Sequence, residues 1–133
     1  MKKIVQKFGG TSLNSDEKRK LAANKIKDAV KNDFSPIVVV SAMGRLGDAY
    51  ATDTLINLAE NAHKDIEARE KDLLMSCGEV ISAVVMVQYL KSIGIKAVAL
   101  TGSQAGIKTN NNFGESRVKE VNPVKIIDIL KIG

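Results

Sequence analysis

The segment from Lys7 to Ser12, Lys-Phe-Gly-Gly-Thr-Ser, has residue types that could hold a phosphate group. A glycine pair after a strand lets the backbone approach an anion closely, and a helix N-terminus behind it would add free N–H groups. Lys7 would add positive charge at the carboxyl end of the strand, where open α/β sheets bind ligands. The spacing matches neither Walker A nor the dinucleotide-binding glycine pattern. These residues therefore indicate either a phosphate-binding loop or a tight turn without a ligand.

Two later segments carry polar groups that could share a crevice with this loop. Ser41 ends a run of branched residues and is followed by Met43-Gly44, so its hydroxyl is expected beside Gly9-Gly10; an ordinary exit from a strand is the alternative. Glu79 stands at the expected start of an apolar helix, where a carboxylate stabilises the helix dipole. If it is partly buried it needs a cation, either a substrate ammonium group or a basic side chain of the fold.

Cys77 and His63 are the only residues of their types, and they cannot make a zinc site by themselves. Cys77 has no evident base nearby and is expected to be a packing residue. His63 lies in a polar segment and is expected to be exposed. Met43, Met75 and Met86 are spaced as core residues.

The composition indicates one domain with an aliphatic core. The 133 residues are 44% hydrophobic, but only 4% are aromatic, which favours Val/Ile-rich strands covered by helices. With one cysteine the chain can form no intrachain disulfide. We find no apolar run that would span a membrane and no signal peptide, and we therefore expect a cytoplasmic protein.

The net charge of +5 arises largely from basic residues on one expected helix. A solvated helix face explains them, and nucleic-acid binding is not expected because aromatic residues for base stacking are missing. The residues concerned are Lys18, Arg19, Lys20, Lys25, Lys27 and Lys31.

The first forty residues predict a strand, a helix and a second strand. Residues 2–8 are a short β-friendly segment stopped by glycines, and a helix over 15–32 would start at an Asn14 cap with Glu17 as its reciprocal partner. Residues 37–42 begin with four consecutive branched apolar residues, as in a strand of a parallel sheet buried on both faces. This order is a βαβ unit.

The remainder predicts helices, one more core strand and a hairpin. We expect Cys77-Gly78 to separate two helices, the second of them apolar on nearly all sides, deep in the fold and ended by Gly94. The expected elements are a loop at 43–53, helices at 53–62, 67–76 and 79–93, a buried strand at 95–101, a loop at 101–106, a hairpin of 107–109 with 116–121, and a helix at 123–131. Three core strands are few for a parallel sheet, so we expect a piece of a larger domain or one that needs a partner; a complete small domain is the alternative.

Six segments, in order, resemble the N-terminal portion of aspartate kinases, which are members of the amino acid kinase family. They lie at residues 5–12, 38–44, 52–55, 69–74, 76–82 and 100–106. Residues 44–53 are most similar to the diaminopimelate-sensitive aspartate kinase of bacilli and related bacteria.

The resemblance implies an α/β fold, a three-layer αβα sandwich around a mainly parallel sheet. Residues 1–133 would be the N-terminal portion of the kinase domain, with the C-terminal part of that domain and regulatory ACT domains outside it. It implies transfer of phosphate from ATP to L-aspartate, giving ADP and 4-phospho-L-aspartate, the first step toward lysine, threonine, methionine and diaminopimelate. It also implies a homo-oligomer at full length, and from the composition we expect no nucleic-acid or membrane partner.

The resemblance further assigns roles to individual residues. Lys7 would be the catalytic residue that neutralises phosphate charge. Lys7, Phe8, Gly9, Gly10, Thr11 and Ser41 would bind ATP, and Ser41, Thr52, Asp53 and Glu79 would bind aspartate, with Glu79 holding its α-amino group. No side chain is expected to ligate a metal, because Mg²⁺ would be held mainly through the ATP phosphates.

Elementary chemistry agrees with this reaction. A carboxylate acceptor is ionised at neutral pH and needs no general base, so a catalytic histidine is not required. The barrier is repulsion between anions, which positive charge and N–H groups offset. Another amino acid kinase, acting on glutamate, carbamate or a nucleotide, and a non-catalytic partner module are the alternatives. The Ser-x-Gly-Glu and Thr-Gly-x-Gln-Ala-Gly segments argue against another kinase.

Overall fold

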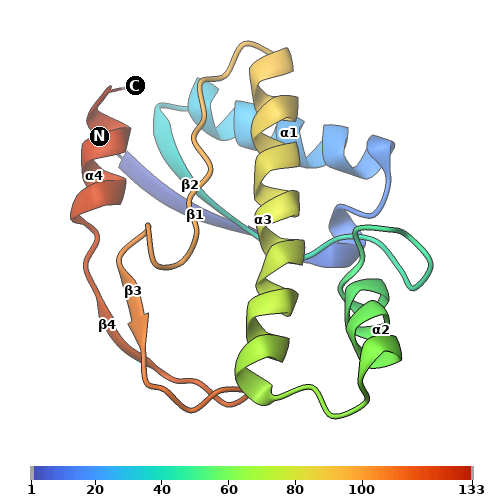
Figure 1. Ribbon diagram of the computed structural model, residues 1–133. Helices are drawn as coiled ribbons and strands as arrows, with labels where there is room; N and C mark the ends of the chain where they lie inside the picture. Colours follow the sequence, from blue (N-terminus) through green and yellow to red (C-terminus); the bar gives the residue numbers. More distant parts are fainter. Residues whose placement is uncertain (1, 133) are drawn as a thin grey trace.

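The computed structural model describes residues 2–132 and contains helices, a parallel pair of strands and a separate antiparallel pair (Figure 1). The elements in chain order are β1 (Lys2–Phe8), the 3₁₀ turn η1 (Gly10–Ser12), α1 (Asp16–Lys31), β2 (Phe34–Val40), α2 (Thr52–Ala62), α3 (Ala68–Ser92), β3 (Ile107–Thr109), β4 (Val118–Val121) and α4 (Val124–Ile132). The predicted strand at 2–8 and the helices near 15–32 and 53–62 are confirmed, as are the hairpin and the last helix.

Strands β1 and β2 are parallel, in a register that runs from Lys2 opposite Phe34 to Phe8 opposite Val40. Helices α1 and α3 contact each other and both contact β2, and Phe8 and Val40 pack into the core they form. On the alternate positions of the strands, Val5 is 65% exposed and Val39 is 45% exposed. The expectation that residues 37–42 are buried on both faces is therefore wrong, because the helices that contact these strands bury one face of the pair.

The N-cap of helix α1 lies one residue later than predicted. Ser15 is the N-cap, and its hydroxyl accepts a hydrogen bond from the Lys18 N–H at 3.2 Å. The predicted Asn14–Glu17 capping pair is wrong because the chain is still extended at Ser15. The helix ends before Asp33, whose φ of 61° turns the chain into β2.

Helix α3 is one continuous helix of 25 residues, so the predicted break at Cys77-Gly78 is wrong. Glycine costs a helix about 1 kcal/mol relative to alanine, and here contacts of Gly78 with other segments explain its presence. The expectation that this helix lies deep in the fold is also wrong. Its buried residues form a single stripe, Gly78, Ser82, Met86 and Leu90, and Val80 and Val84 are exposed.

By length and composition alone, α3 could cross a membrane, so the expectation that no segment is long and apolar enough is wrong. One such helix is weak support for a membrane protein, because the core helix of a soluble domain passes the same test. Here α3 packs on α1, α2 and β2 and supplies Met86 and Leu90 to the core.

The core is small and aliphatic, as the composition indicated. It consists of Leu13, Ala22, Ala23, Ile26, Met43, Met86 and Leu90. Met43 and Met86 lie in the core as expected, but Met75 does not, since it is 39% exposed on α3. Helix packing on the parallel strands therefore rests on α1 and the C-terminal half of α3.

Residues 95–101 do not form the predicted third strand, although Ile95 and Ala97 pack against the core. A strand is defined by its hydrogen-bonded neighbour, and the described residues provide none for this segment.

The hairpin of β3 and β4 is antiparallel, as predicted, with an irregularity after Lys108. The loop between the two strands is held on α3, where the Gly114 N–H donates to Asp72 Oδ2 at 2.7 Å. This contact joins residues 42 positions apart in the chain.

Candidate functional site

Three segments meet where β1 and β2 end. They are the turn at residues 9–12, called the glycine turn below, the residues after β2, and the middle of α3. The Ser41 N–H donates to the Phe8 carbonyl at 3.1 Å, which holds the two strand ends together. The Ala42 N–H donates to Glu79 Oε1 at 3.2 Å, which brings α3 to the same place. Ala42 is thus the common neighbour of the glycine turn and of Glu79.

The glycine turn is compact and leaves open space on one side. Gly9 is extended, and the 3₁₀ turn that follows is closed by the Ser12 N–H donating to Gly9 O at 2.9 Å. A Cβ on Gly10 would lie 2.5 Å from the Ala42 carbonyl oxygen, so only glycine allows this approach. A Cβ on Gly9 would meet no atom within 4 Å. Gly10 is therefore needed for packing, and Gly9 leaves room above the turn.

The N-terminus of α1 does not stand directly behind the glycines, contrary to expectation. Residues 13–15 separate it from the turn, and its first turn contains Asp16 and Glu17. Negative side chains at that position complement the helix's own dipole. The N–H groups nearest a ligand at the glycines would therefore be those of the 3₁₀ turn.

Glu79 lies in the middle of α3 and not at a helix start, so the predicted dipole role is wrong. Its side chain is exposed, and its observed partner is the Ala42 N–H. The expectation of a partly buried carboxylate that needs a cation is also wrong. Because α3 continues through Gly78, Glu79 is presented from a rigid helix.

Thr52 is brought next to Gly78, the residue before Glu79, by a close approach of two helices. Thr52 is the first residue of α2, and a Cβ on Gly78 would lie 2.8 Å from both its Oγ1 and the Ala42 Cβ. Gly78 thus allows α3 to sit directly on Thr52 and Ala42. Asp53 follows in the first turn of α2 and is exposed.

Lys7 and Phe8 alternate across β1, so their side chains point to opposite faces. Phe8 packs into the core with α1 and α3, which leaves its backbone for a ligand. Lys7 is exposed on the other face, opposite Val39 in the strand register. The structure thus groups Ser41, Thr52, Glu79 and the glycine turn, and it places Lys7 at the same strand end but on the uncovered face.

Two basic residues of α1 contact the segments of this site, which the sequence did not predict. The Lys18 ammonium donates to the Thr11 carbonyl at 2.9 Å, and the Arg19 guanidinium donates to the Leu13 carbonyl at 2.9 Å. Both were assigned to a solvated helix face. The spacing of charged residues along a helix does not distinguish a side chain that hydrogen-bonds to a neighbouring loop from one that points into water.

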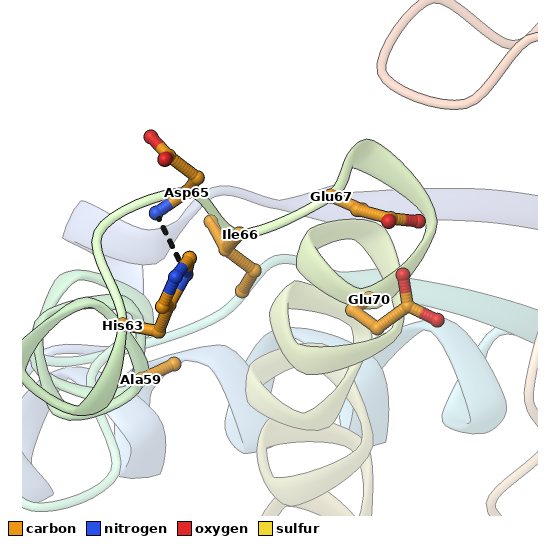
Figure 2. Close-up of a pocket in the computed structure, with 6 residues that line it drawn as sticks. All are labelled: Ala59, His63, Asp65, Ile66, Glu67 and Glu70. Carbon is orange, nitrogen blue, oxygen red and sulfur yellow. Dashed lines mark hydrogen bonds between the residues drawn. The ribbon is translucent and has the colours of Figure 1, made fainter.

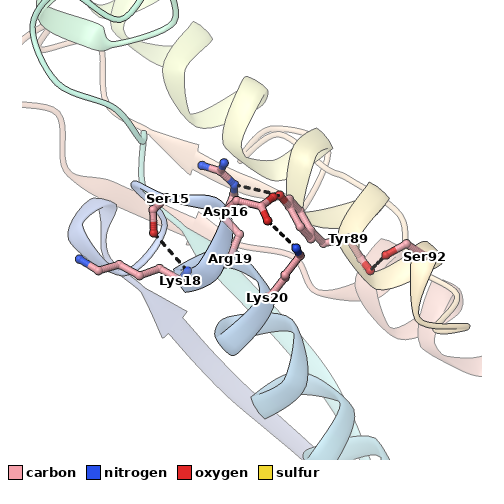
Figure 3. A network of polar contacts seen from close by, with 7 residues as sticks. All are labelled: Ser15, Asp16, Lys18, Arg19, Lys20, Tyr89 and Ser92. Atoms are coloured by element: carbon pink, nitrogen blue, oxygen red, sulfur yellow. Dashed lines mark hydrogen bonds and ion pairs between the residues drawn. The ribbon is translucent and has the colours of Figure 1, made fainter.

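A polar network links α1 to α3 beside these contacts (Figure 3). Tyr89 of α3 donates a hydrogen bond from its hydroxyl to Asp16, which also pairs with Lys20 at 2.6 Å. The hydrogen bond from Lys20, followed by that from Tyr89, lowers the pKa of Asp16. The same pairing with Asp16 raises the pKa of Lys20.

Two surface hollows lie away from the predicted residues. One, of about 420 Å³, is at the α2–α3 connection (Figure 2) and is lined by Ala59, His63, Asp65, Ile66, Glu67 and Glu70. There His63 is exposed, as predicted, and its Nδ1 accepts the Asp65 N–H at 3.3 Å. The other, of about 330 Å³, lies beside β3 and α4.

Cys77 is exposed on α3, which corrects the expectation that it is packed. Across residues 2–132, we find no cluster of three His, Cys, Asp or Glu side chains placed to hold a metal ion.

Residues 2–133 match the sequence profile of the amino acid kinase family, and the chain belongs to that family. Among its relatives, Aspartokinase 1 of Bacillus subtilis is 50% identical over 130 residues, which cover 98% of this chain and 32% of the relative. An aspartokinase of Geobacillus stearothermophilus is 42% identical over 130 residues, which cover 98% of this chain and 31% of the relative. The chain thus spans about a third of the length of these relatives.

The crystal structure of the aspartate kinase from Synechocystis is similar in fold. It superimposes with a TM-score of 0.67 at 41% identity, over 75% of this chain and 16% of that one. The α/β class and the amino acid kinase fold expected from the sequence are confirmed, with β1 and β2 as part of the parallel sheet and with α1 and α3 on one face of it.

Proposed function

We propose that this chain forms the N-terminal part of the active site of an aspartate kinase, which transfers the γ-phosphoryl group of ATP to the side-chain carboxylate of L-aspartate. One observation carries the proposal. Glu79 and the glycine turn converge on Ala42 from segments about seventy residues apart, so a possible ammonium-binding carboxylate lies next to a possible phosphate-binding turn. The names of the similar proteins support the same substrate pair.

In this proposal the glycine turn and Lys7 hold the ATP phosphates. A phosphate would occupy the open space beside Gly9, and Thr11 in the turn and Ser41 after β2 would add further polar groups. Lys7 supplies the formal positive charge as the catalytic residue. Phe8 contributes its backbone, since its side chain is packed in the core.

Aspartate is held by groups of α2, α3 and the β2 exit. Glu79 binds the α-amino group with the carboxylate that Ala42 orients, and its exposed position leaves that carboxylate accessible. Ser41, Thr52 and Asp53 line the remainder of the pocket. Gly78 supports this role because it allows α3 to bring Glu79 and Thr52 together.

The reaction then depends on positioning and charge. Two anions must approach, and the aspartate carboxylate is already ionised, so no side chain has to remove a proton. Lys7 and the turn's N–H groups reduce the repulsion as charge shifts toward the leaving ADP. Mg²⁺ would arrive with ATP and be held mainly by the phosphates.

The proposal extends to the cellular context. The product, 4-phospho-L-aspartate, would start the route to lysine and diaminopimelate in the cytoplasm, where ATP is available. The full-length protein would be a homo-oligomer that binds neither nucleic acid nor a membrane.

The test is replacement of Lys7 in the complete product of the gene. We expect Lys7→Ala to lower kcat for aspartate-dependent ADP release by about 10²–10³, the cost of removing one transition-state charge contact, while KM for aspartate changes less than about threefold. Lys3→Ala is the matched control, because Lys3 lies on the same face of β1 and is also exposed. A near-normal kcat in Lys7→Ala would refute the catalytic role of Lys7. Release of ADP by the wild-type enzyme with glutamate but not with aspartate would refute aspartate as the substrate.

A further inference from the structure

Arg19 has more contacts outside its own helix than its place on a charged helix would suggest. It lies in the first turns of α1 and is half-buried. One terminal nitrogen donates to the Leu13 carbonyl at 2.9 Å and lies 3.7 Å from Met43 Sδ. Nε donates to the Tyr89 hydroxyl at 3.4 Å, and the guanidinium carbon lies 5.7 Å from the centre of the Tyr89 ring (Figure 3).

These contacts reach two of the three segments that build the candidate site, and also the C-terminal end of α3, the helix that carries the third. Leu13 closes the glycine turn, since its N–H donates to Gly10 O at 3.1 Å. Met43 directly follows Ala42, whose N–H binds Glu79. Tyr89 stands on α3 about three turns beyond Glu79. Both Leu13 and Met43 are buried, so Arg19 contacts parts of these segments that are fixed in the core.

We propose that Arg19 is a positioning residue, which sets the spacing between the glycine turn, Ala42 and Glu79 without touching substrate. This inference rests on the proposed function and adds a residue to it. An arginine suits the role because its planar guanidinium carries five donors in a fixed arrangement and stacks on an aromatic ring. A lysine has one nitrogen and cannot reach Leu13, Met43 and Tyr89 at once.

Tyr89 allows the network to be altered without removing the arginine. Its hydroxyl accepts from Arg19 and donates to Asp16, while its ring lies beneath the guanidinium. Tyr89→Phe keeps the ring and the packing of α3 but removes the acceptor of the Arg19 hydrogen bond, together with the donor to Asp16. It therefore separates the orientation of Arg19 from the presence of its charge.

The kinetic test uses Arg19→Lys, Arg19→Ala and Tyr89→Phe in the complete gene product. A displacement of about 1 Å at a reacting centre can cost about 10², so we expect kcat to fall 10- to 100-fold in Arg19→Lys and 3- to 10-fold in Tyr89→Phe. KM for ATP should stay within about threefold. Added methylguanidine should restore part of the kcat of Arg19→Ala, which a residue that acts only on stability would not show. Lys25→Met, another exposed cation of α1, is the control.

A readout independent of activity separates this inference from the proposed function. Hydrogen exchange of the Ala42 amide reports its bond to Glu79, and we expect it to speed up at least tenfold in Arg19→Lys but not in Lys25→Met. Unchanged exchange and kcat in a folded Arg19→Lys protein overturn the positioning role; if that variant does not fold, unchanged values in Tyr89→Phe overturn it. An inactive wild-type protein refutes the proposed function, and the exchange result then decides whether Arg19 positions Ala42 and Glu79.

Discussion

Gly9 and Gly10 are neighbours in the chain, but a side chain should have different effects at the two positions. At Gly10 a Cβ would press on the backbone carbonyl of Ala42 from 2.5 Å, and a backbone atom cannot easily move away. At Gly9 the φ of −72° suits any residue, and the space is open. One glycine thus serves the fold, and the other leaves room for a ligand.

We therefore expect Gly10→Ala to lower the free energy of unfolding by about 1–3 kcal/mol, the usual cost of overpacking. Gly9→Ala should change it by less than about 0.5 kcal/mol and should raise KM for ATP instead. Urea unfolding and ATP titration of the same two variants check both effects. The interpretation of the turn is wrong if Gly9→Ala proves the more destabilising of the pair.

The lowered pKa of Asp16 leads us to expect that the stability of the fold depends on pH. Its pKa is lowered in the folded protein, first by the hydrogen bond from Lys20 and then by that from Tyr89. A carboxyl group with a depressed pKa stabilises the fold above its unfolded pKa, and this contribution disappears as the pH falls through the folded value. Wild type and Asp16→Asn should therefore differ most in melting temperature near neutral pH, and the difference should disappear as the pH falls below 3.8, the ordinary pKa of the group, and through the lower folded value. Added salt should reduce the difference, because the pair is exposed.

The sequence indicates most of the residues of the candidate site but not how they are held. Glycines after a strand, and a Ser or Glu near a strand end, are local signals that need no tertiary information. Arg19 gives no such signal, because Tyr89 is separated from it by 70 positions and the helical spacing of charges reports only exposure. The partner of Glu79 could not be predicted either, since it is a backbone N–H and every residue but proline has one.

At the scale of elements, the wrong predictions have a common physical cause. Gly78 carries a helix penalty in isolation, so the sequence predicts a break, but packing on Ala42 and Thr52 favours the continuous α3. Residues 95–101 have the composition of a strand, and yet a strand requires a neighbour that composition does not provide. The elements that depend on local pattern, β1, α1 and the hairpin, are those the sequence predicts well.

The hairpin should depend on one carboxylate of α3. Asp72 Oδ2 accepts the Gly114 N–H at 2.7 Å, and hydrogen bonds to charged groups contribute about 1.5–3 kcal/mol. We expect Asp72→Ala to speed hydrogen exchange at Gly114 and in β3–β4 while α1 and β1 keep their protection. Glu70→Ala is the matched control, because its observed partner is the adjacent Arg69. Equal exchange at Gly114 in both variants would show that the hairpin is held elsewhere.

At the scale of the whole molecule, the chain aligns with about a third of each relative. We propose that the remainder of the site lies in the part of an aspartate kinase that this alignment does not reach. We therefore expect the 133-residue chain alone to release no ADP with aspartate. When it replaces the aligned 130 residues of Bacillus subtilis Aspartokinase 1, the chimeric protein should be active, and Lys7→Ala should lower its kcat by the same factor as in the complete gene product. Turnover by the isolated chain would contradict this division of the site.

The sequence predicts the family and the α/β class because its motifs occur in order over nearly the whole chain. It does not predict that α1 and α3 lie on the same face of the parallel strands, since that depends on which apolar stripe of α3 is buried. For the same reason, the position of Lys7 on the opposite face becomes evident only from the strand register.

Helix α3 also carries a site at which a spectroscopic label can be attached. Cys77 is the only cysteine in the sequence, and it is exposed two positions before Glu79 on the same rigid helix. In the 133-residue chain, a thiol-reactive fluorophore or spin label therefore attaches at a single place without mutagenesis. Its emission or mobility would report ligand binding near the Glu79 carboxylate without requiring turnover.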